Sequence, residues 1–130
     1  RAGQLSMLFS DMAADRANGN YVLCGGDFNH DLKADESDTE NRESWAYPFP
    51  RSNLPEGFSF AMDLLTDEQK AALPHTSRMT DIPYDKENSY VVTLDGFIIS
   101  DNIQCLNYNT IVTDYAYSDH EPVSFQFSLR

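Results

Sequence analysis

The feature that most constrains the fold is an apolar run that breaks into two glycines. Residues 21–24 form this run, Gly25-Gly26 end it, and Asp27 and Asn29 follow. Few polar residues interrupt the run, so we expect a strand that is buried on both faces. In extended geometry residues i and i+2 lie on the same side of the chain, so Asp27 and Asn29 are expected to point into one space at its end.

Length and charge limit the classes of function. The chain has 130 residues, enough for one domain with a core but not for two. Nine basic against 21 acidic residues give a net charge of −12. This charge disfavours unaided binding to nucleic acid or an anionic membrane, without excluding nucleic acid. It suits a protein that recruits divalent cations and lets them face an anionic substrate.

A helix is expected before the apolar run. Apolar residues recur at helical spacing over about Ala2 to Ala17, and residues 18–20 (Asn-Gly-Asn) supply conformations that end a helix. Helix, short turn and buried strand together predict an α/β layer. The residues of the apolar stripe are Leu5, Leu8, Phe9, Met12 and Ala13.

Between residues 30 and 57 the periodicity disappears and acidic residues crowd the chain. We interpret this segment as a solvated surface loop rather than a calcium site, because no glycine falls at the turn position that an EF-hand requires. Its aromatic residues Trp45, Tyr47 and Phe49 either form a substrate-facing wall or pin the loop to the core. Thr66 and Gln69 then have the spacing of a capping box, which predicts a short helix that ends before Pro74.

The last third of the chain is rich in β-forming residues, and it closes on a strict apolar–polar alternation over 123–129. That alternation predicts a strand buried on one face. Asp95-Gly96 lies between two β-rich runs, and its spacing alone favours a two-residue hairpin turn. In the alternative interpretation, Asp95 is a strand residue whose carboxylate orients a histidine. Cys24 and Cys105 are interpreted as buried free thiols.

Candidate chemical groups also lie near the end of the chain. Ser118-Asp119-His120 precedes Pro122, which blocks regular strand pairing, so these residues are expected in a loop at a strand's start. Asp119 could bind a metal or position water, and His120 could exchange a proton or stabilise a phosphoryl oxygen. The irregular linker over 75–84 carries His75, Arg78 and Tyr84, any of which could contact a phosphate or could be a plain surface or hinge position. Arg78 is taken as the candidate substrate-binding residue.

Three motifs occur in a fixed order: Gly-Gly-Asp-Phe-Asn at 25–29, Leu-Asp-Gly-Phe-Ile-Ile-Ser at 94–100 and Ser-Asp-His-Glu-Pro-Val at 118–123. Together they resemble the endonuclease/exonuclease/phosphatase superfamily, which includes DNase-I-like nucleases, sphingomyelinases and inositol polyphosphate phosphatases. The resemblance covers nearly the whole chain. It implies that residues 1–130 are the C-terminal half of a four-layer α/β sandwich with a mainly antiparallel mixed sheet.

The resemblance also implies roles for five residues. Asp27 would position or deprotonate the attacking water, and Asn29 would bind the scissile phosphate. Asp119 would help to hold Mg²⁺ or Mn²⁺. His120 would stabilise the phosphoryl transition state, with Asp95 hydrogen-bonded to its other ring nitrogen. This implied role favours the strand interpretation of Asp95 over the hairpin.

Some family motifs are not matched. The early asparagine, the metal-binding glutamate and a further histidine or tyrosine near the phosphate would precede the helix on which this chain opens. We therefore expect a missing N-terminal half of the same domain to cover an exposed apolar face of this chain. We also expect the 130 residues alone to lack a complete metal site and to be inactive.

The expected function is metal-dependent hydrolysis of a phosphodiester or phosphomonoester, and the negative charge favours a small or lipid-like substrate over duplex DNA. One alternative is an inactive superfamily member that binds a phosphate ligand or a protein. Another is an unrelated acidic α/β domain, which would require three coincidental motif matches. No apolar run approaches membrane-spanning length, and no signal-peptide pattern opens the chain. The chain starts at Arg1, so localisation is not assigned.

Overall fold

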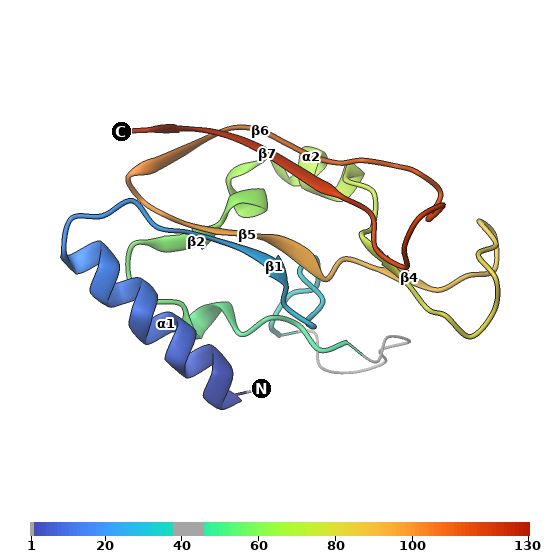
Figure 1. Ribbon diagram of the computed structural model, residues 1–130, viewed down its shortest axis with the longest axis horizontal. Helices are drawn as coiled ribbons and strands as arrows, with labels where there is room; N and C mark the ends of the chain where they lie inside the picture. The colour runs from blue at the N-terminus through green and yellow to red at the C-terminus, as the bar shows by residue number, and fades with distance from the viewer. Residues whose placement is uncertain (1, 38–45) are drawn as a thin grey trace.

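The computed structural model describes residues 2–37 and 46–130, and it shows an α+β fold of helices and antiparallel strands (Figure 1). The described residues form two α-helices and two short 3₁₀ helices, all within residues 2–72, and seven strands, the last five of which follow one another. The helices are α1 (Ala2–Ala17), η1 (Arg51–Asn53), η2 (Ala61–Leu64) and α2 (Asp67–Ala72). The strands are β1 (Leu23–Asp27), β2 (Phe58–Phe60), β3 (Ser77–Arg78), β4 (Val91–Val92), β5 (Asp95–Ser100), β6 (Ile103–Thr110) and β7 (Val123–Leu129).

The described strands form three small antiparallel sheets, and their stacking gives the molecule its layers. The central sheet has the order β1-β5-β2, while β3 pairs with β4 and β6 pairs with β7. Figure 1 shows α1 on one side of the central sheet and the β6–β7 hairpin on the other. The α+β class is therefore confirmed, and the four-layer sandwich of a larger domain stays a prediction.

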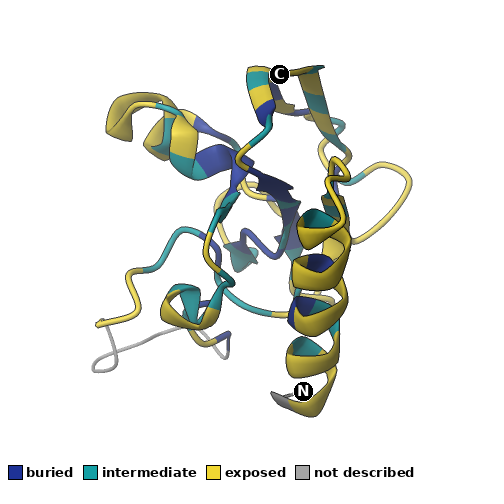
Figure 2. Ribbon diagram, turned by 90° about the vertical axis from the view of Figure 1, so that its left-hand side faces the viewer, coloured by how far each residue is buried: buried dark blue, intermediate teal, exposed yellow. Residues whose placement is uncertain are grey.

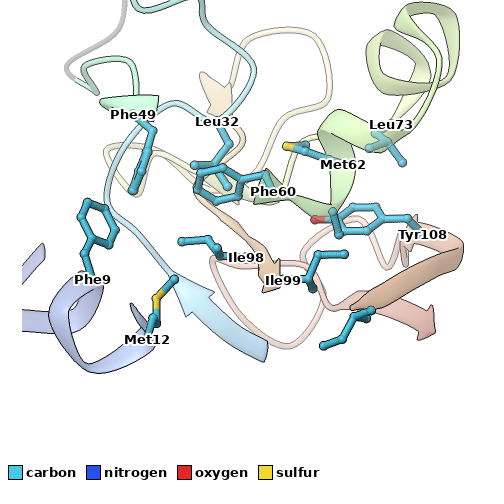
Figure 3. Close-up of a cluster of buried hydrophobic side chains, with 12 residues drawn as sticks. Phe9, Met12, Leu32, Phe49, Phe60, Met62, Leu73, Ile98, Ile99 and Tyr108 are labelled. Atoms are coloured by element: carbon cyan, nitrogen blue, oxygen red, sulfur yellow. The ribbon is translucent and has the colours of Figure 1, made fainter. Parts of the chain in front are cut away.

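Helix α1 has the predicted bounds, and it ends where Gly19 takes a φ of +84°. Phe9 and Met12 point from it into the main core, where they meet Phe49 and Ile98 (Figure 3). The outer face of the helix is exposed along its length (Figure 2). This helix therefore covers one face of the central sheet, as its apolar stripe predicts.

Strand β1 differs from its prediction. It runs over Leu23–Asp27 rather than 21–24, and it is mostly exposed instead of buried on both faces. The reason is that β1 lies at the edge of the central sheet, where β5 is its one partner strand among the described residues. Gly25 serves close packing: a Cβ on this residue would lie 2.5 Å from the ring of Phe97 on β5, so the bare backbone leaves room for that ring.

The β6–β7 hairpin covers the other face of the sheet through aromatic contacts. The Phe97 and Phe125 ring centroids lie 5.1 Å apart, and Tyr108 also packs beside both rings. The predicted alternation of β7 is confirmed, but its one-sided burial holds only for the first half. Val123 and Phe125 are half-buried, whereas Phe127 and Leu129 are exposed.

The acidic loop is anchored more firmly than its composition predicts. Leu32 and Phe49 are fully buried, so Phe49 pins the loop to the core, whereas Tyr47 faces solvent. Trp45 lies outside the described residues. The capping box at Thr66 is confirmed, with the Thr66 hydroxyl accepting from the Gln69 amide and the Gln69 side chain accepting from the Thr66 amide.

Two further expectations are resolved by the structure. Asp95-Gly96 is not a hairpin turn: both residues lie in β5 and pair with Asp27 and Gly26. The extended chain before Asp95 belongs to β4, which pairs with β3 instead of folding back on β5. Cys24 and Cys105 are free and half-buried. Among the described residues, no helix is long and apolar enough to cross a membrane.

Candidate functional site

The candidate site lies at one end of the central sheet, where β1 ends and β5 begins. Asp27 is the last residue of β1 and Asp95 is the first of β5, and the antiparallel register places them directly opposite each other. Because directly paired residues point to the same face of a sheet, the two carboxylates lie side by side. The sheet register therefore joins two of the three sequence motifs.

The third motif reaches the same place through a loop. His120 forms an isolated bridge with Ser77 just before β7, which confirms the loop position predicted for Ser118-Asp119-His120. Its Nδ1 lies 2.7 Å from Oδ2 of Asp95, and its Nε2 lies 3.8 Å from Oδ2 of Asp27. The ligand atoms of Asp27, Asp95 and His120 all lie within 4.8 Å of one another.

Solvent exposure differs between the three side chains and separates their roles. The exposed fraction is 18% for Asp95, 31% for His120 and 38% for Asp27. Burial raises the pKa of Asp95, and this effect outweighs the opposing hydrogen bonds from Thr76 and His120. Asp95 is thus the shielded partner of the imidazole, and Asp27 is the carboxylate that meets solvent.

The histidine responds mainly to its acidic neighbours. Burial alone would lower the pKa of His120, but the hydrogen bond and charge of Asp95, followed by the charges of Asp27 and Asp119, raise it. A raised pKa keeps more of the imidazole protonated near neutral pH, which favours hydrogen-bond donation to a developing negative charge.

Two buried residues that the sequence did not single out hold this arrangement. Thr76 donates from Oγ1 to Oδ2 of Asp95 at 2.7 Å, and only 1% of Thr76 is exposed. Glu121 is also buried, and its carboxylate accepts hydrogen bonds from the amide and hydroxyl of Thr113 across the loop. Glu121 lies within the third motif but has no predicted role there, and no local pattern marks Thr76, because its partner Asp95 is 19 residues away.

Asn29 lies beside Asp27 but not in the extended geometry that was expected. Its φ is +51°, and its amide donates to Oδ1 of Asp27 at 2.8 Å, so the chain turns immediately after the strand. The same-side relation of an extended chain therefore does not apply. Its predicted phosphate-binding role stays a prediction.

Asp119 and Arg78 meet through their main chains. The Arg78 amide donates to the Asp119 carbonyl at 3.0 Å, while the Arg78 guanidinium donates to the carbonyls of Met79 and Ile82. The Asp119 side chain is exposed, and one of its oxygens lies 3.4 Å from the hydroxyl of Ser118. The backbone of Arg78 thus supports the loop, and its binding of substrate stays a prediction.

A groove of about 260 Å³ opens beside the site. It is lined by Gln4, Leu5 and Leu8 of α1 and by residues 24–30, which include Asp27 and Asn29. The free edge of β1 therefore leads from an apolar recess to the carboxylate of Asp27.

The donor set fits Mg²⁺ or Mn²⁺ in part. These ions prefer oxygen ligands and are often held by one or two carboxylates together with water and substrate phosphate. Asp27 supplies an exposed carboxylate at this end of the sheet, whereas the exposed Asp119 precedes His120 in the loop and is not part of the 4.8 Å cluster of Asp27, Asp95 and His120. Asp95 is less suited as a ligand, since its Oδ2 accepts hydrogen bonds from both Thr76 and His120.

Comparisons with protein-family models, with curated proteins and with solved structures gave no match to this chain. The motifs and the geometry of the site are therefore the basis of the proposed function.

Proposed function

We propose that this chain carries the acid–base half of a divalent-metal-dependent phosphoesterase site of the endonuclease/exonuclease/phosphatase type. One observation supports this most: Asp27, Asp95 and His120, from three separate motifs, have their ligand atoms within 4.8 Å of one another. The motif resemblance implied a hydrogen bond between Asp95 and His120, and these side chains lie 2.7 Å apart. A carboxylate, an imidazole and a second, shielded carboxylate are suited to general acid–base work.

In the proposed reaction, a water oxygen attacks phosphorus in line with the leaving group. The new phosphorus–oxygen bond forms as the bond to the leaving oxygen breaks, and that oxygen keeps the electron pair. Asp27 orients the water and takes its proton. His120, charged and held by Asp95, donates a hydrogen bond from Nε2 to a non-bridging phosphoryl oxygen, whose negative charge it stabilises.

A bound Mg²⁺ or Mn²⁺ would offset charge on the phosphate and on the leaving oxygen. In this chain Asp119 is the proposed ligand that would hold the ion. Asn29 and Arg78 are proposed to bind the phosphate. The net charge of −12 favours a small or lipid-like phosphoester as the substrate.

We further propose that more strands of the same domain pack against the open side of the molecule. Strand β1 lies at the edge of the central sheet, and its Leu23 is exposed; on β7 in the other layer, Phe127 and Leu129 are exposed. Exposed apolar side chains in both layers are unusual for a closed sandwich and typical of a contact surface. The remaining metal ligands would come from that part of the domain.

Hydrolysis of bis-p-nitrophenyl phosphate with Mn²⁺ tests the proposed function. In the complete domain, His120→Ala is expected to lower turnover by at least about 100-fold, since it removes the proposed hydrogen-bond donor to the phosphoryl oxygen. Residues 1–130 alone are expected to show no turnover that depends on His120. Turnover in the complete domain that His120→Ala leaves unchanged would contradict the proposal.

The metal ligand has a matched control in the same loop. Asp119→Asn is expected to raise the Mn²⁺ concentration needed for half-maximal activity, whereas Asp114→Asn, which changes a nearby exposed aspartate, is expected to leave it unchanged. An equal effect of both substitutions would indicate a general charge effect on the loop. A binding module without catalysis would show no activity in any variant.

A further inference from the structure

Thr76 makes an unusual number of contacts for a residue in an irregular linker. Its Oγ1 lies 3.0 Å from the amide nitrogen of Leu94, 3.1 Å from that of Asp95 and 2.7 Å from Oδ2 of Asp95. Only 1% of its surface is exposed, so water has little access to any of these groups. A small polar side chain with this many partners calls for an explanation.

The direction of each of these hydrogen bonds follows from the chemistry of a hydroxyl. A threonine hydroxyl has two acceptor lone pairs and one proton to donate. The amides of Leu94 and Asp95 only donate, so they occupy both lone pairs. The remaining proton lies toward Oδ2 of Asp95, which is the one acceptor at hydrogen-bond distance. The hydroxyl therefore has a fixed role as a donor to the carboxylate.

This donor constrains the imidazole of His120 in turn. Oδ2 of Asp95 also lies 2.7 Å from Nδ1 of His120, and an ionised carboxylate oxygen only accepts. Nδ1 must then carry a proton, so neutral His120 has its lone pair on Nε2. Nε2 lies 3.8 Å from Oδ2 of Asp27, and it is the nitrogen that gains the second proton when the His120 ring becomes charged.

We propose that Thr76 is a positioning residue: its hydroxyl, held by two backbone amides, fixes the Asp95 carboxylate and through it the Nδ1–H tautomer of His120. The observed distances alone support the chain of hydrogen bonds from Thr76 to His120, whereas its effect on catalysis rests on the proposed function. The main chain of Thr76 reinforces this role, because its carbonyl accepts from the amide of Glu121, next to His120, at 2.7 Å.

A matched pair of variants separates the hydroxyl from the rest of the side chain. Thr76→Val keeps the shape and removes the hydroxyl, whereas Thr76→Ser keeps the hydroxyl and removes a methyl group. The measurement is the ¹⁵N NMR pattern of the histidine rings of the 130-residue chain, with chelator present and above the titration range of His120. His30 and His75 serve as references in the same spectrum.

The wild type and Thr76→Ser are expected to show His120 as the Nδ1–H tautomer. Thr76→Val is expected to shift it toward the Nε2–H tautomer, which a histidine side chain prefers in water. A Thr76→Val spectrum in which His120 stays Nδ1–H would overturn the proposal. So would an equal shift in both variants, because the methyl group would then be responsible.

A measurement on the wild type covers the case in which Thr76→Val does not fold, since it leaves two buried amides without their acceptor. The Thr76 hydroxyl proton should exchange slowly with solvent and show a nuclear Overhauser contact with Hδ1 of His120, because both protons bond to the same oxygen. A hydroxyl proton that exchanges too fast to observe would contradict the proposal.

Turnover by the complete domain is a second readout, independent of the NMR measurements. Removing a partner that orients a functional histidine or ligand typically costs about 10–100-fold in activity, so Thr76→Val should lose this much turnover and Thr76→Ser much less. If the wild type shows no hydrolysis, the proposed function fails, and the tautomer of His120 still decides the role of Thr76.

Discussion

The three site residues owe their different properties to small differences in position. Asp95 is shielded and bonded to two donors, His120 lies between two carboxylates, and Asp27 meets solvent. Burial and hydrogen bonding act in opposite directions on the pKa of both Asp95 and His120, and burial prevails at Asp95 while the acidic neighbours prevail at His120. The shielded carboxylate of Asp95 can therefore hold His120 in one orientation, while the open carboxylate of Asp27 stays accessible to water.

Asp95→Asn tests the electrostatic cause directly. Because it removes both the charge and the strongest acceptor of the Nδ1 proton, the pKa of His120 should fall relative to the wild type. The measurement is an NMR titration of the His120 ring protons with chelator present. Asp114→Asn serves as the control and should leave the pKa unchanged. A pKa that Asp95→Asn leaves unchanged would show that burial, rather than Asp95, sets the titration of His120.

The same shift predicts how stability depends on pH. The folded-state pKa of His120 lies above its unfolded value of about 6.5, so protonation stabilises the folded state. This stabilisation is fully present below about pH 6.5. It is lost as the pH rises through the folded pKa. The free energy of unfolding of the wild type relative to Asp95→Asn should therefore be highest below about pH 6.5 and fall as the pH rises through the folded pKa of His120.

At the scale of elements, strand β6 contains a buried group without a partner. The Tyr108 hydroxyl is buried and makes no hydrogen bond to any described residue, and a Cβ on Gly96 would lie 3.1 Å from it. Burial, followed by the charge of Asp95, raises the pKa of Tyr108. An unsatisfied buried hydroxyl costs about 1–3 kcal/mol, while its ring contributes packing against Phe97 and Phe125.

Tyr108→Phe should therefore keep the free energy of unfolding or raise it by up to about 1 kcal/mol, because the ring stays and the unsatisfied hydroxyl goes. Tyr115→Phe is the matched control: the Tyr115 hydroxyl donates to the His75 carbonyl, so its loss should cost about 0.5–1.5 kcal/mol. Denaturant unfolding measures both. A loss of more than about 1 kcal/mol in Tyr108→Phe would indicate a hydrogen-bond partner for this hydroxyl.

The elements also show which features a sequence can predict. Helix α1, the capping box at Thr66 and the alternation of β7 depend on local spacing, and all three are confirmed. The burial of β1 was wrong because an apolar run does not reveal whether a strand has neighbours on both edges. Asp95-Gly96 was wrong as a hairpin on spacing alone, since the same dipeptide also suits a strand that pairs closely with Gly26.

The residues of the site also divide into those that the sequence predicts and those that only the tertiary structure shows. Motif order identified Asp27, Asp95 and His120. The sheet register brings Asp27 and Asp95 together, and the loop before β7 adds His120. Thr76 was missed because its partners lie 18 and 19 residues away, and a threonine in a linker has no local signature. The residues proposed to act on substrate are marked by motifs, whereas the positioning residue proposed here, Thr76, is found only through its tertiary contacts.

At the scale of the whole molecule, the core and the open side have different characters. The main core is compact around Phe49, Phe60 and Ile98, as Figure 3 shows. On β1 and β7, by contrast, Leu23, Phe127 and Leu129 are exposed to solvent. On the proposed function this side receives the rest of the domain, and the acid–base residues at the end of the sheet would then meet the remaining metal ligands.

The location of bound Mn²⁺ on the 130-residue chain tests the proposed metal-dependent site most directly. Paramagnetic broadening in the ¹H–¹⁵N spectrum should be centred on residues 27–29 and 118–120. Asp119→Asn should weaken it, and Asp114→Asn should not. Broadening centred instead on the acidic residues Asp31, Asp35 and Glu36, or spread evenly over the surface, would contradict the assignment of this end of the sheet as a metal and phosphate site.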